Sequence, residues 1–433
     1  MQLRGSGDTL IIAATGDFLA REPMPGRKAD RGYANVVQIL KGASLALTTL
    51  DQDLLDEKSL PAPGESSSPR WPYGTIREAK ELRDIGFTLV SLANNHAADY
   101  GIEGMKQTWG ILDHEGLQHA GSGENLQQAM APVYAGTAPR RVAVIAVTTS
   151  AAPESRATYT QGEILGRPGV NVLRYSPRVT VDPSTFATLS GSRLQTHPAT
   201  SHDSSELMLS GTVIHKGQKT TVQFVANEQD SNGVLAQIRL ARSNADVVIV
   251  MLHSHEPSNE SDTPAEFAQQ FARAAIDAGA NMVVGDGPHQ LRGIELYRGR
   301  LIFYSLGNFA FQSGTVDPSA VDVYDRGTDL FGLTLGAIGN METYPATNPE
   351  EPRWWESVIA ITTFDHGKLK SIQLQPVDLG IDLPLSQRGA PRRTTPERGA
   401  EILQRLAVLS QHFGTQLRIE NGLGFIDIDQ GEH

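Results

Sequence analysis

The sequence contains no cysteine among its 433 residues. This absence excludes disulfide bonds, thiolate nucleophiles and cysteine-ligated zinc. Any bound metal ion would therefore have to be held by histidine, aspartate, glutamate or asparagine side chains, which present nitrogen and oxygen atoms. The absence of cysteine does not by itself indicate a cellular compartment, because proteins without disulfides occur in both reducing and oxidising surroundings.

Long hydrophobic runs and basic clusters are also missing. The first apolar run, residues 10–14, is too short for the core of a signal peptide, and no run reaches the roughly 18 residues of a membrane span. Lys and Arg number 37 against 49 Asp and Glu, a net charge of -12, which disfavours nucleic acid as a partner. We expect a cytoplasmic protein without an integral membrane segment, or an exported one if an N-terminal segment has been trimmed. The oligomeric state is not specified.

The residues that are present describe an ordinary globular chain with an α/β pattern. Hydrophobic residues make up 39%, and the length fits two or three domains or one large α/β domain with insertions. Short apolar runs typical of strands buried on both faces alternate with amphipathic segments typical of helices, at 75–86 and 265–280 for example. The pattern therefore predicts the α/β class. The predicted strands cover residues 10–14, 45–50, 87–93, 141–147, 247–252, 281–286 and 301–309.

Three further segments are predicted to be less regular. Residues 57–74 form a long loop that is a candidate lid, and residues 176–209 are rich in Ser, Thr and Pro and predict an excursion from the sheets. Residues 211–227 have the pattern of a β-hairpin that turns at Lys216 and Gly217.

Polar side chains gather where the predicted strands end. In open α/β sheets ligands bind outside the carboxyl ends of the strands, so these clusters are expected to form one site. Mixed nitrogen and oxygen ligands suit Mn, Fe, Zn, Ca or Mg, bound as one ion or as two ions that share a carboxylate. In chain order the clusters are Asp17; Asp51 and Asp53; Asn95, His96 and Asp99; His253, His255 and Glu256; and Asp286 with His289.

Each cluster taken alone has a simpler interpretation. An aspartate after a strand is commonly the N-cap of the next helix, and the segment around Asp286 has the glycines and proline of a turn. His253 and His255 are two residues apart and so share one face of a strand, a spacing that an exposed pair without a metal would also have. The coincidence of five clusters at five strand ends nevertheless favours a shared site. Gly307 and Asn308 are interpreted as a turn that closes the sheet edge, and Trp354 and Trp355 as packing residues.

The order of these motifs resembles the CapA family, named for poly-γ-glutamate capsule biosynthesis. The resemblance runs from about residue 9 to 313, returns at 399–415 and is weakest at 176–230. It implies a calcineurin-like metallophosphoesterase fold, a four-layer α/β/β/α sandwich with mixed sheets and an inserted hairpin or loop region. Residues 1–313 would form the CapA-like domain with an insertion at about 176–230, and residues 314–433 would complete the same domain. The motifs that carry the resemblance are TGDFLAR, TTLDQDL, SLANNHAADYGIEG, VIVMLHSHE and the run from GANMVVGDGPH to YSLGNFAFQ.

The resemblance assigns roles to individual residues. It implies that Asp17 and Asn95 bind metal, that His96 faces the substrate, and that His253 and His289 are late ligands. Two positions depart from the family pattern: Asp51 stands where a glutamate is usual, and Asp286 where a histidine is usual. The added carboxylate favours Mn, Mg or Ca over Zn and makes one hard ion an alternative to two. The candidate metal ligands are Asp17, Asp51, Asn95, His253, Asp286 and His289, and the candidate catalytic residues are His96, Asp99 and His255.

Three functions remain open at this stage. The first is a metal-dependent hydrolase or transferase acting on a phosphoester, or on an acyl or peptide link of an anionic polymer such as poly-γ-glutamate, with His96 as the acid. The second is a metal-dependent peptide epimerase or isomerase that uses histidine–aspartate pairs such as His96 with Asp99. The third is a non-catalytic assembly or binding subunit with the same fold.

Overall fold

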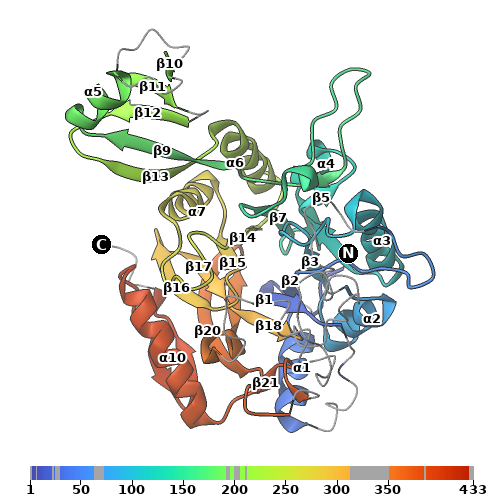
Figure 1. The fold of residues 1–433 in the computed structure, drawn as a ribbon. Coiled ribbons are helices and arrows are strands. Elements are labelled where there is room, and N and C mark those ends of the chain that lie inside the picture. The colour runs from blue at the N-terminus through green and yellow to red at the C-terminus, as the bar shows by residue number, and fades with distance from the viewer. Residues whose placement is uncertain are drawn as a thin grey trace, which may run out of the picture.

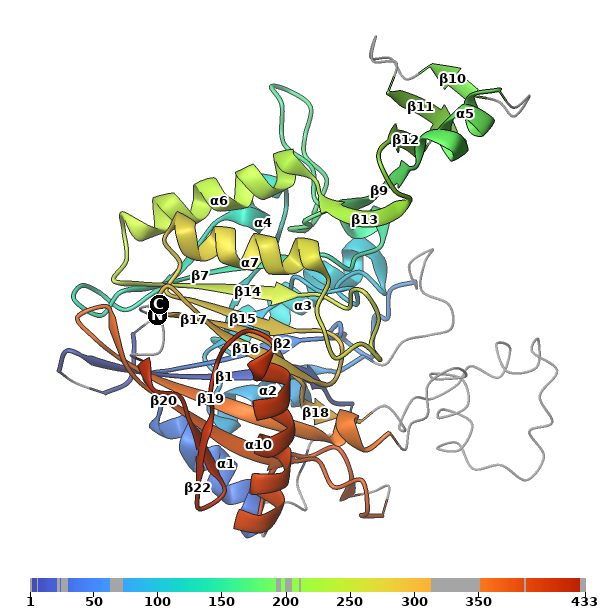
Figure 2. The ribbon, with the colours of Figure 1, turned by 90° about the vertical axis from the view of Figure 1, so that its left-hand side faces the viewer.

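Two β-sheets stacked face to face form the centre of the protein, and helices cover their outer faces (Figures 1 and 2). The structure is a computed structural model that describes residues 2–5, 7–21, 24, 30–62, 73–191, 196–198, 205–209, 212–312, 351–384 and 387–428. The layers follow the order α/β/β/α, which confirms the predicted fold class. Among the described residues, no helix combines the length and the apolar character needed to cross a bilayer.

The first sheet carries the N-terminal strands and most of the C-terminal ones. Strand β1 lies near its middle, parallel to β2 on one side and antiparallel to β19 on the other. In spatial order the sheet contains β22 (Arg418–Glu420), β23 (Leu423–Phe425), β20 (Lys368–Asp378), β19 (Glu356–Asp365), β1 (Thr9–Leu19), β2 (Leu45–Leu50), β3 (Leu89–Ser91) and β4 (Gln118–Ala120), with β18 (Asn308–Phe311) against β1 and β21 (Arg392–Arg393) against β20.

The second sheet is built from the middle of the chain, and its central strands β7, β14, β15 and β17 run parallel. It contains β16 (Leu291–Tyr297), β17 (Arg300–Leu306), β15 (Met282–Asp286), β14 (Val247–His253), β7 (Val142–Thr148) and β6 (Val133–Ala135) in spatial order. A two-stranded ribbon, β5 (Ser122–Gly123) with β8 (Gly169–Val170), lies apart from both large sheets.

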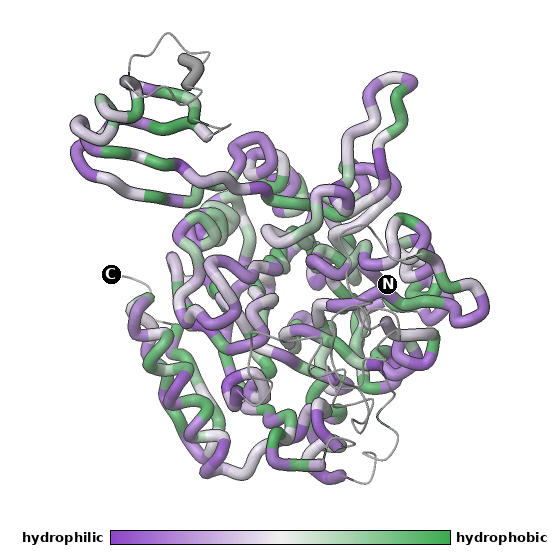
Figure 3. The backbone as a smooth tube through the Cα atoms, viewed as in Figure 1, coloured by the Kyte–Doolittle hydropathy of each residue, from purple (hydrophilic) through white to green (hydrophobic). Residues whose placement is uncertain are grey.

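Helices complete the outer layers. Helices α1 and α2 pack on the first sheet, α6 and α7 pack on the second, and α10 packs against β16 and β20. Apolar and polar residues alternate along α10 in Figure 3, as expected for a helix with one buried face. The helices are α1 (Arg31–Gly42), α2 (Ile76–Ile85), α3 (Gly101–His114), α4 (Leu126–Met130), α5 (Pro183–Gly191), α6 (Glu228–Arg242), α7 (Glu266–Ala278) and α10 (Pro396–Gln411), with single 3-10 turns η2 (Pro153–Ser155) and η4 (Pro352–Trp355).

Alternation along the strands divides the core into layers. In β14, Ile249 and Met251 face the first sheet, whereas Val248 and Val250 face α6 and α7. Because successive strand residues point to opposite faces, a continuous apolar run is needed when both faces are covered. This requirement explains why every residue of β14 is buried, up to His253 at its end.

The segment between β8 and α6 forms a small sheet of its own that projects from the sandwich (Figure 1). The predicted hairpin at 211–227 is wrong, because β12 and β13 do not pair with each other but lie on opposite sides of β9. The loop after β12 crosses the end of β9, where the Gly217 N–H donates to Val181 O at 2.8 Å. The described strands of this sheet are, in spatial order, β10 (Thr196–Pro198), β11 (Glu206–Leu209), β12 (Thr212–Lys216), β9 (Tyr175–Val181) and β13 (Thr221–Ala226).

The C-terminal strands join the N-terminal strands in one sheet. Strand β19 pairs with β1 along six residues, from the Thr9–Asp365 pair to the Ala14–Ala360 pair. A strand that completes the sheet of another segment shares its hydrophobic core and does not fold apart from it. We therefore propose that residues 314–433 complete the domain of residues 1–313, with the projecting sheet as an insertion.

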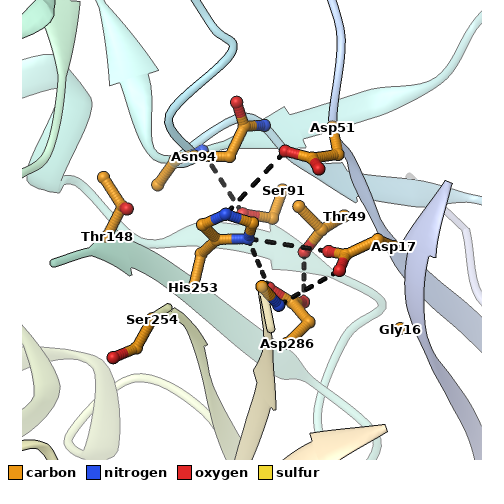
Figure 4. A network of polar contacts seen from close by, with 12 residues as sticks. Gly16, Asp17, Thr49, Asp51, Ser91, Asn94, Thr148, His253, Ser254 and Asp286 are labelled. Atoms are coloured by element: carbon orange, nitrogen blue, oxygen red, sulfur yellow. Dashed lines mark hydrogen bonds and ion pairs between the residues drawn. The ribbon is translucent and has the colours of Figure 1, made fainter. Parts of the chain in front are cut away.

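Close approach of two backbones at Gly16 sets the position of Asp17. A Cβ atom at Gly16 would lie 1.7 Å from the carbonyl oxygen of Gly307, so only glycine fits there. The Asp17 N–H donates to the same carbonyl at 3.0 Å. Figure 4 shows Gly16 beside Asp17, and both lie in the last part of β1.

We expect Gly16→Ala to destabilise the protein by about 3 kcal/mol or more, the upper range for forcing an atom into a packed interior. Chemical denaturation measures the loss. A matched control is Gly110→Ala on α3, where a Cβ meets no atom within 4 Å; this change should stabilise the helix by roughly 0.5–1 kcal/mol. Equal stabilities for the two variants would contradict the close approach.

Candidate metal centre at the strand ends

Four strands deliver polar side chains to one buried point between the two sheets. Asp17 in β1, Asp51 after β2, His253 in β14 and Asp286 in β15 surround each other in Figure 4. The register brings them together, because His253 lies directly opposite Asp286 in the parallel pair β14–β15. All four side chains are fully buried.

Two carboxylates at this point have oxygen atoms without a hydrogen-bond partner. Asp17 Oδ1 and both oxygens of Asp51 are buried and accept no hydrogen bond from the described residues. Asp17 Oδ1 lies 3.6 Å from His253 Nδ1, and Asp51 Oδ1 lies 3.8 Å from His253 Nε2. A buried carboxylate is costly unless a cation or hydrogen bonds compensate its charge. The unsatisfied oxygens of Asp17 and Asp51 therefore fit a bound cation.

Ligand atoms gather in two overlapping groups around Asp17. Asp17, Asp51 and His289 form one group, and Asp17, His253 and Asp286 form the other; in each, one ligand atom per residue lies within 4.8 Å of the others. Asp17 Oδ2 also accepts from the Gly287 N–H at 3.1 Å and lies 3.6 Å from His289 Nδ1. The structure thus brings these five predicted residues to one point.

Each histidine of the site is oriented through its Nδ1 atom. A side-chain oxygen lies within hydrogen-bond distance of Nδ1 in all four rings, and such contacts orient metal-binding histidines and leave Nε2 toward the ion. The pairs are His96 with Asp99 Oδ2 at 2.7 Å, His253 with Asp286 Oδ1 at 2.8 Å, His255 with Asn259 Oδ1 at 2.6 Å, and His289 with Asn308 Oδ1 at 2.9 Å.

The two adjacent asparagines after β3 have different surroundings. Asn94 Nδ2 donates to Leu50 O at 2.6 Å, and its Oδ1 accepts from the His96 N–H at 2.9 Å, so Asn94 shapes the turn. Asn95 Oδ1 instead lies 2.8 Å from His253 Nε2 and 3.0 Å from His255 Nε2. Asn95 is therefore the asparagine that reaches the centre.

The charges of the site shift several pKa values. Burial and the charge of Asp286 raise the pKa of Asp17 to about 8. Burial opposes the charged form of His96, but Asp99 and Asp51 outweigh it and raise the pKa of His96 to about 9. Burial and the neighbouring charge of His253 hold the pKa of His255 well below its ordinary value. At neutral pH these shifts favour a protonated ring at His96 and a neutral ring at His255.

Two acidic residues of the predicted strand-end clusters lie beside the centre and stabilise loops. Asp53 Oδ2 accepts from the Tyr100 N–H at 3.1 Å, which fixes the start of α3. Glu256 Oε1 accepts from Ser150 at 2.9 Å. Neither carboxylate belongs to the groups of ligand atoms around Asp17.

Sequence reasoning missed several residues that support the site. Asn308, interpreted as part of a turn, is buried and binds both the ring and the backbone carbonyl of His289. Thr49 donates its hydroxyl to Asp286, and Asn259 orients His255. Asn308 had a detectable signal, since it follows an apolar run in the same way as the predicted residues. The candidate lid at 57–74 falls mostly on residues 63–72, outside the described residues.

Comparisons with known proteins find similarity to bacterial capsule synthesis proteins. A family model described as bacterial capsule synthesis protein PGA_cap matches residues 6–313. The protein y4sH of Sinorhizobium fredii is 35% identical over 97% of this chain and 93% of its own length. The PGA biosynthesis protein CapA of Bacillus subtilis is 29% identical over 66% of this chain and 60% of its own length, and the capsule biosynthesis protein CapA of Bacillus anthracis is 28% identical over 62% and 52%.

Proposed function

The chain belongs to the bacterial capsule synthesis protein family, and from this membership we propose that it is a divalent-metal-dependent hydrolase or transferase. Its proposed substrate is an anionic polymer related to poly-γ-glutamate or the cell envelope, cleaved or transferred at an acyl or phosphoester link. The substrate class derives from the names of the similar Bacillus proteins.

One observation carries the proposal: three carboxylate oxygens, on Asp17 and Asp51, are buried without hydrogen-bond partners among the described residues. A chain that folds around unsatisfied carboxylates gains stability when a cation binds them. Asp17, Asp51 and His289 would hold this cation. A bound divalent ion polarises the group under attack and lowers the pKa of water, so that a nucleophile is available near neutral pH.

The residues around the cation supply proton transfer. His96 is held by Asp99 through Nδ1, and its raised pKa keeps it protonated at neutral pH. It would donate a proton to the leaving group, a role that a positioned acid with a suitable pKa can fill. Asp99 orients the ring and stabilises its charge. Asn94, which binds the His96 N–H, fixes the backbone on which the ring stands.

A second candidate is epimerisation or isomerisation of a peptide substrate. It is favoured by two histidine–aspartate pairs at one site, His96 with Asp99 at 2.7 Å and His253 with Asp286 at 2.8 Å. Two such bases could remove and return a proton at a carbon beside a carboxylate bound to the cation. We rank this candidate second because of the position of His253. Its buried ring lies against the carboxylates that would hold the cation, so it is less available as a base.

The proposal predicts that activity depends on metal. Protein stripped by a chelator is reloaded with Mn, Mg, Ca, Co or Zn and assayed on p-nitrophenyl phosphate and on γ-linked polyglutamate, with release of nitrophenol or of new amino termini as the readout. Turnover should vanish on stripping and return with metal. Asp84→Asn serves as the control, because Asp84 is an exposed carboxylate on α2 that belongs to neither group of ligand atoms.

Two other outcomes discriminate the alternatives. Metal-dependent entry of solvent deuterium at a glutamyl α-carbon, without chain cleavage, would favour the epimerase. Absence of both reactions, in protein that binds γ-linked polyglutamate, would favour a non-catalytic subunit and overturn the proposal.

A further inference from the structure

Strand β13 is an outer strand of the projecting sheet, and its free edge is unprotected (Figure 1). Among the described residues it pairs with β9 on one side and with no strand on the other. The pairing runs without a bulge from the Thr221–Thr180 pair to the Ala226–Tyr175 pair. The strand sequence, TVQFVA, contains no proline and no charged residue. Edge strands commonly use bulges, prolines or charges to prevent pairing, because their unpaired N–H and C=O groups accept another strand readily.

The side chains of β13 are apolar and exposed to solvent. Val222, Phe224 and Val225 are 60%, 45% and 42% exposed. Val222 lies opposite Val179 of β9, and Phe224 lies opposite Pro177. Directly opposed residues of an antiparallel pair share a face of the sheet, and so do alternate residues of one strand. Val179, Val222, Pro177 and Phe224 therefore form one apolar stripe.

The apolar stripe is packed at both ends and open in the middle. At the outer end it packs with Phe186 of α5. At the end near the sandwich, Phe224 contacts Tyr175 edge to face with ring centroids 5.5 Å apart, and Tyr175 stacks on Phe267 of α7 at 4.6 Å. Val222 and Phe224, between these contacts, keep about half of their surface in water. The packed ends hold the free edge in a fixed extended conformation, which lowers the entropy lost when another strand binds.

The charge around β13 is opposite in sign to that of the whole chain. Residues 171–227 contain five Lys and Arg against three Asp and Glu, whereas the chain as a whole has a net charge of -12. Arg178 lies opposite Gln223, on the face of the sheet away from the apolar stripe. Arg178 and Lys219 are exposed and form no ion pair with the described residues. This charge favours a partner that carries carboxylates.

The size of the free edge favours a peptide over a second copy of the chain. The six residues of β13 span about 20 Å at roughly 3.3 Å per residue. Pairing two such edges, each about 10 Å across, would bury on the order of 400 Å² in total, well below the roughly 1,000 Å² of a stable interface. A second β13 would also bring no negative charge. A short peptide needs less area, because main-chain hydrogen bonds to the edge supply its affinity.

We propose that the free edge of β13 binds an extended segment of another polypeptide as an added strand. Apolar side chains of this segment lie against the apolar stripe, and acidic side chains occupy the alternate positions, on the face that carries Arg178. The inference goes beyond the proposed function and does not depend on metal. The edge ends beside the candidate metal centre, because Ala226 pairs with Tyr175, whose hydroxyl is hydrogen bonded to Glu256 in the loop after β14.

Fluorescence anisotropy tests the proposal with the full chain and a labelled α-linked heptapeptide in which glutamate and valine alternate. We expect saturable binding to the unaltered protein. Val222→Glu should weaken binding at least 10-fold, because it removes an apolar contact and places a negative charge beside an acidic peptide. Val408→Glu on α10 is the matched control and should bind normally. Val222 and Val408 are 60% and 66% exposed, so neither change removes a buried side chain.

Two further measurements separate strand addition from simple attraction of charge. The same peptide with every backbone nitrogen methylated keeps its carboxylates but has no N–H donors, so it should bind at least 10-fold more weakly than the unmodified peptide. Arg178→Gln should weaken binding of the unmodified peptide several-fold at low salt. It should also reduce the salt dependence of binding, because screening by salt acts on the charge that has been removed.

Several results would overturn the proposal. They are the absence of peptide binding by the unaltered protein, equal binding of the methylated peptide, and equal binding by Val222→Glu. Light scattering adds one more: a dimer of the unaltered protein that Val222→Glu converts to a monomer would identify a second copy of the chain as the occupant of the edge and exclude the peptide. None of these results bears on the proposed metal dependence, which is measured separately.

Discussion

Asp17→Asn is expected to abolish the stabilisation that a divalent ion gives to this protein. At an ion concentration 100 times the dissociation constant, binding contributes about 2.7 kcal/mol to the free energy of unfolding. With an unfolding entropy of about 2 cal/mol/K per residue, this raises the melting temperature of a chain of 433 residues by about 3 °C. Scanning calorimetry with Mn²⁺ and with a chelator should show this difference for the unaltered protein and none for Asp17→Asn.

The same variant should not be destabilised when metal is absent. Burial and Asp286 raise the pKa of Asp17 from 3.8 to about 8, so the folded state binds a proton that the unfolded state releases. Stability from this group is therefore fully present below the unfolded pKa and falls as the pH rises toward about 8. Asparagine mimics the neutral form and can accept from the Gly287 N–H. As the pH rises from 4 to 8 without metal, the free energy of unfolding should therefore fall less in Asp17→Asn than in the unaltered protein.

A chelator effect of equal size in Asp17→Asn and the unaltered protein would contradict the assignment of Asp17 as a ligand. Asp53→Asn is the matched control, because Asp53 is also buried at a strand end but binds the Tyr100 N–H and lies outside the groups of ligand atoms. Metal should stabilise Asp53→Asn as it stabilises the unaltered protein.

His96→Gln is expected to lower kcat by about 10² to 10⁴, the range for loss of a positioned general acid. Metal content should stay unchanged, because the proposed ligands Asp17, Asp51 and His289 remain. The measurement is kcat on whichever of the phosphoester and γ-glutamyl substrates the unaltered protein turns over, beside elemental analysis of the same sample. Asp99→Asn should lose less activity than His96→Gln, since it removes only the carboxylate that orients the His96 ring and stabilises its positive charge.

A loss of metal together with activity in His96→Gln would mean that His96 is a ligand and not the acid. Retention of more than a tenth of the activity would mean that another group donates the proton. His119→Gln is the control, because His119 is also largely buried and lies on the neighbouring strand β4, where it contacts Asp113 at 3.5 Å and no residue of the centre.

The layered fold could be predicted from the sequence because its signals are local. Most buried strands are short apolar runs, and several helix boundaries have capping residues. At α2, for example, Thr75 accepts from the Arg77 N–H at the start, and Gly86 ends the helix with a positive φ of 118°. The arrangement of β9 between β12 and β13 was not predicted. Strand order within a sheet depends on which strands pair with each other. The sequence pattern of residues 211–227 is the same whether the two strands pair directly, as in a hairpin, or have another strand between them.

The sequence by itself determined that polar residues gather toward the carboxyl ends of the strands, because the apolar runs give way there to Asp17, Asp51 and His253. Only the tertiary structure decided what each residue does at that edge. Asn95 reaches His253 across 158 residues of chain, whereas its neighbour Asn94 turns to the backbone of Leu50. The physical reason is that the orientation of each ring and the burial of each carboxylate depend on contacts between segments far apart in sequence. Local sequence patterns carry no information about such contacts.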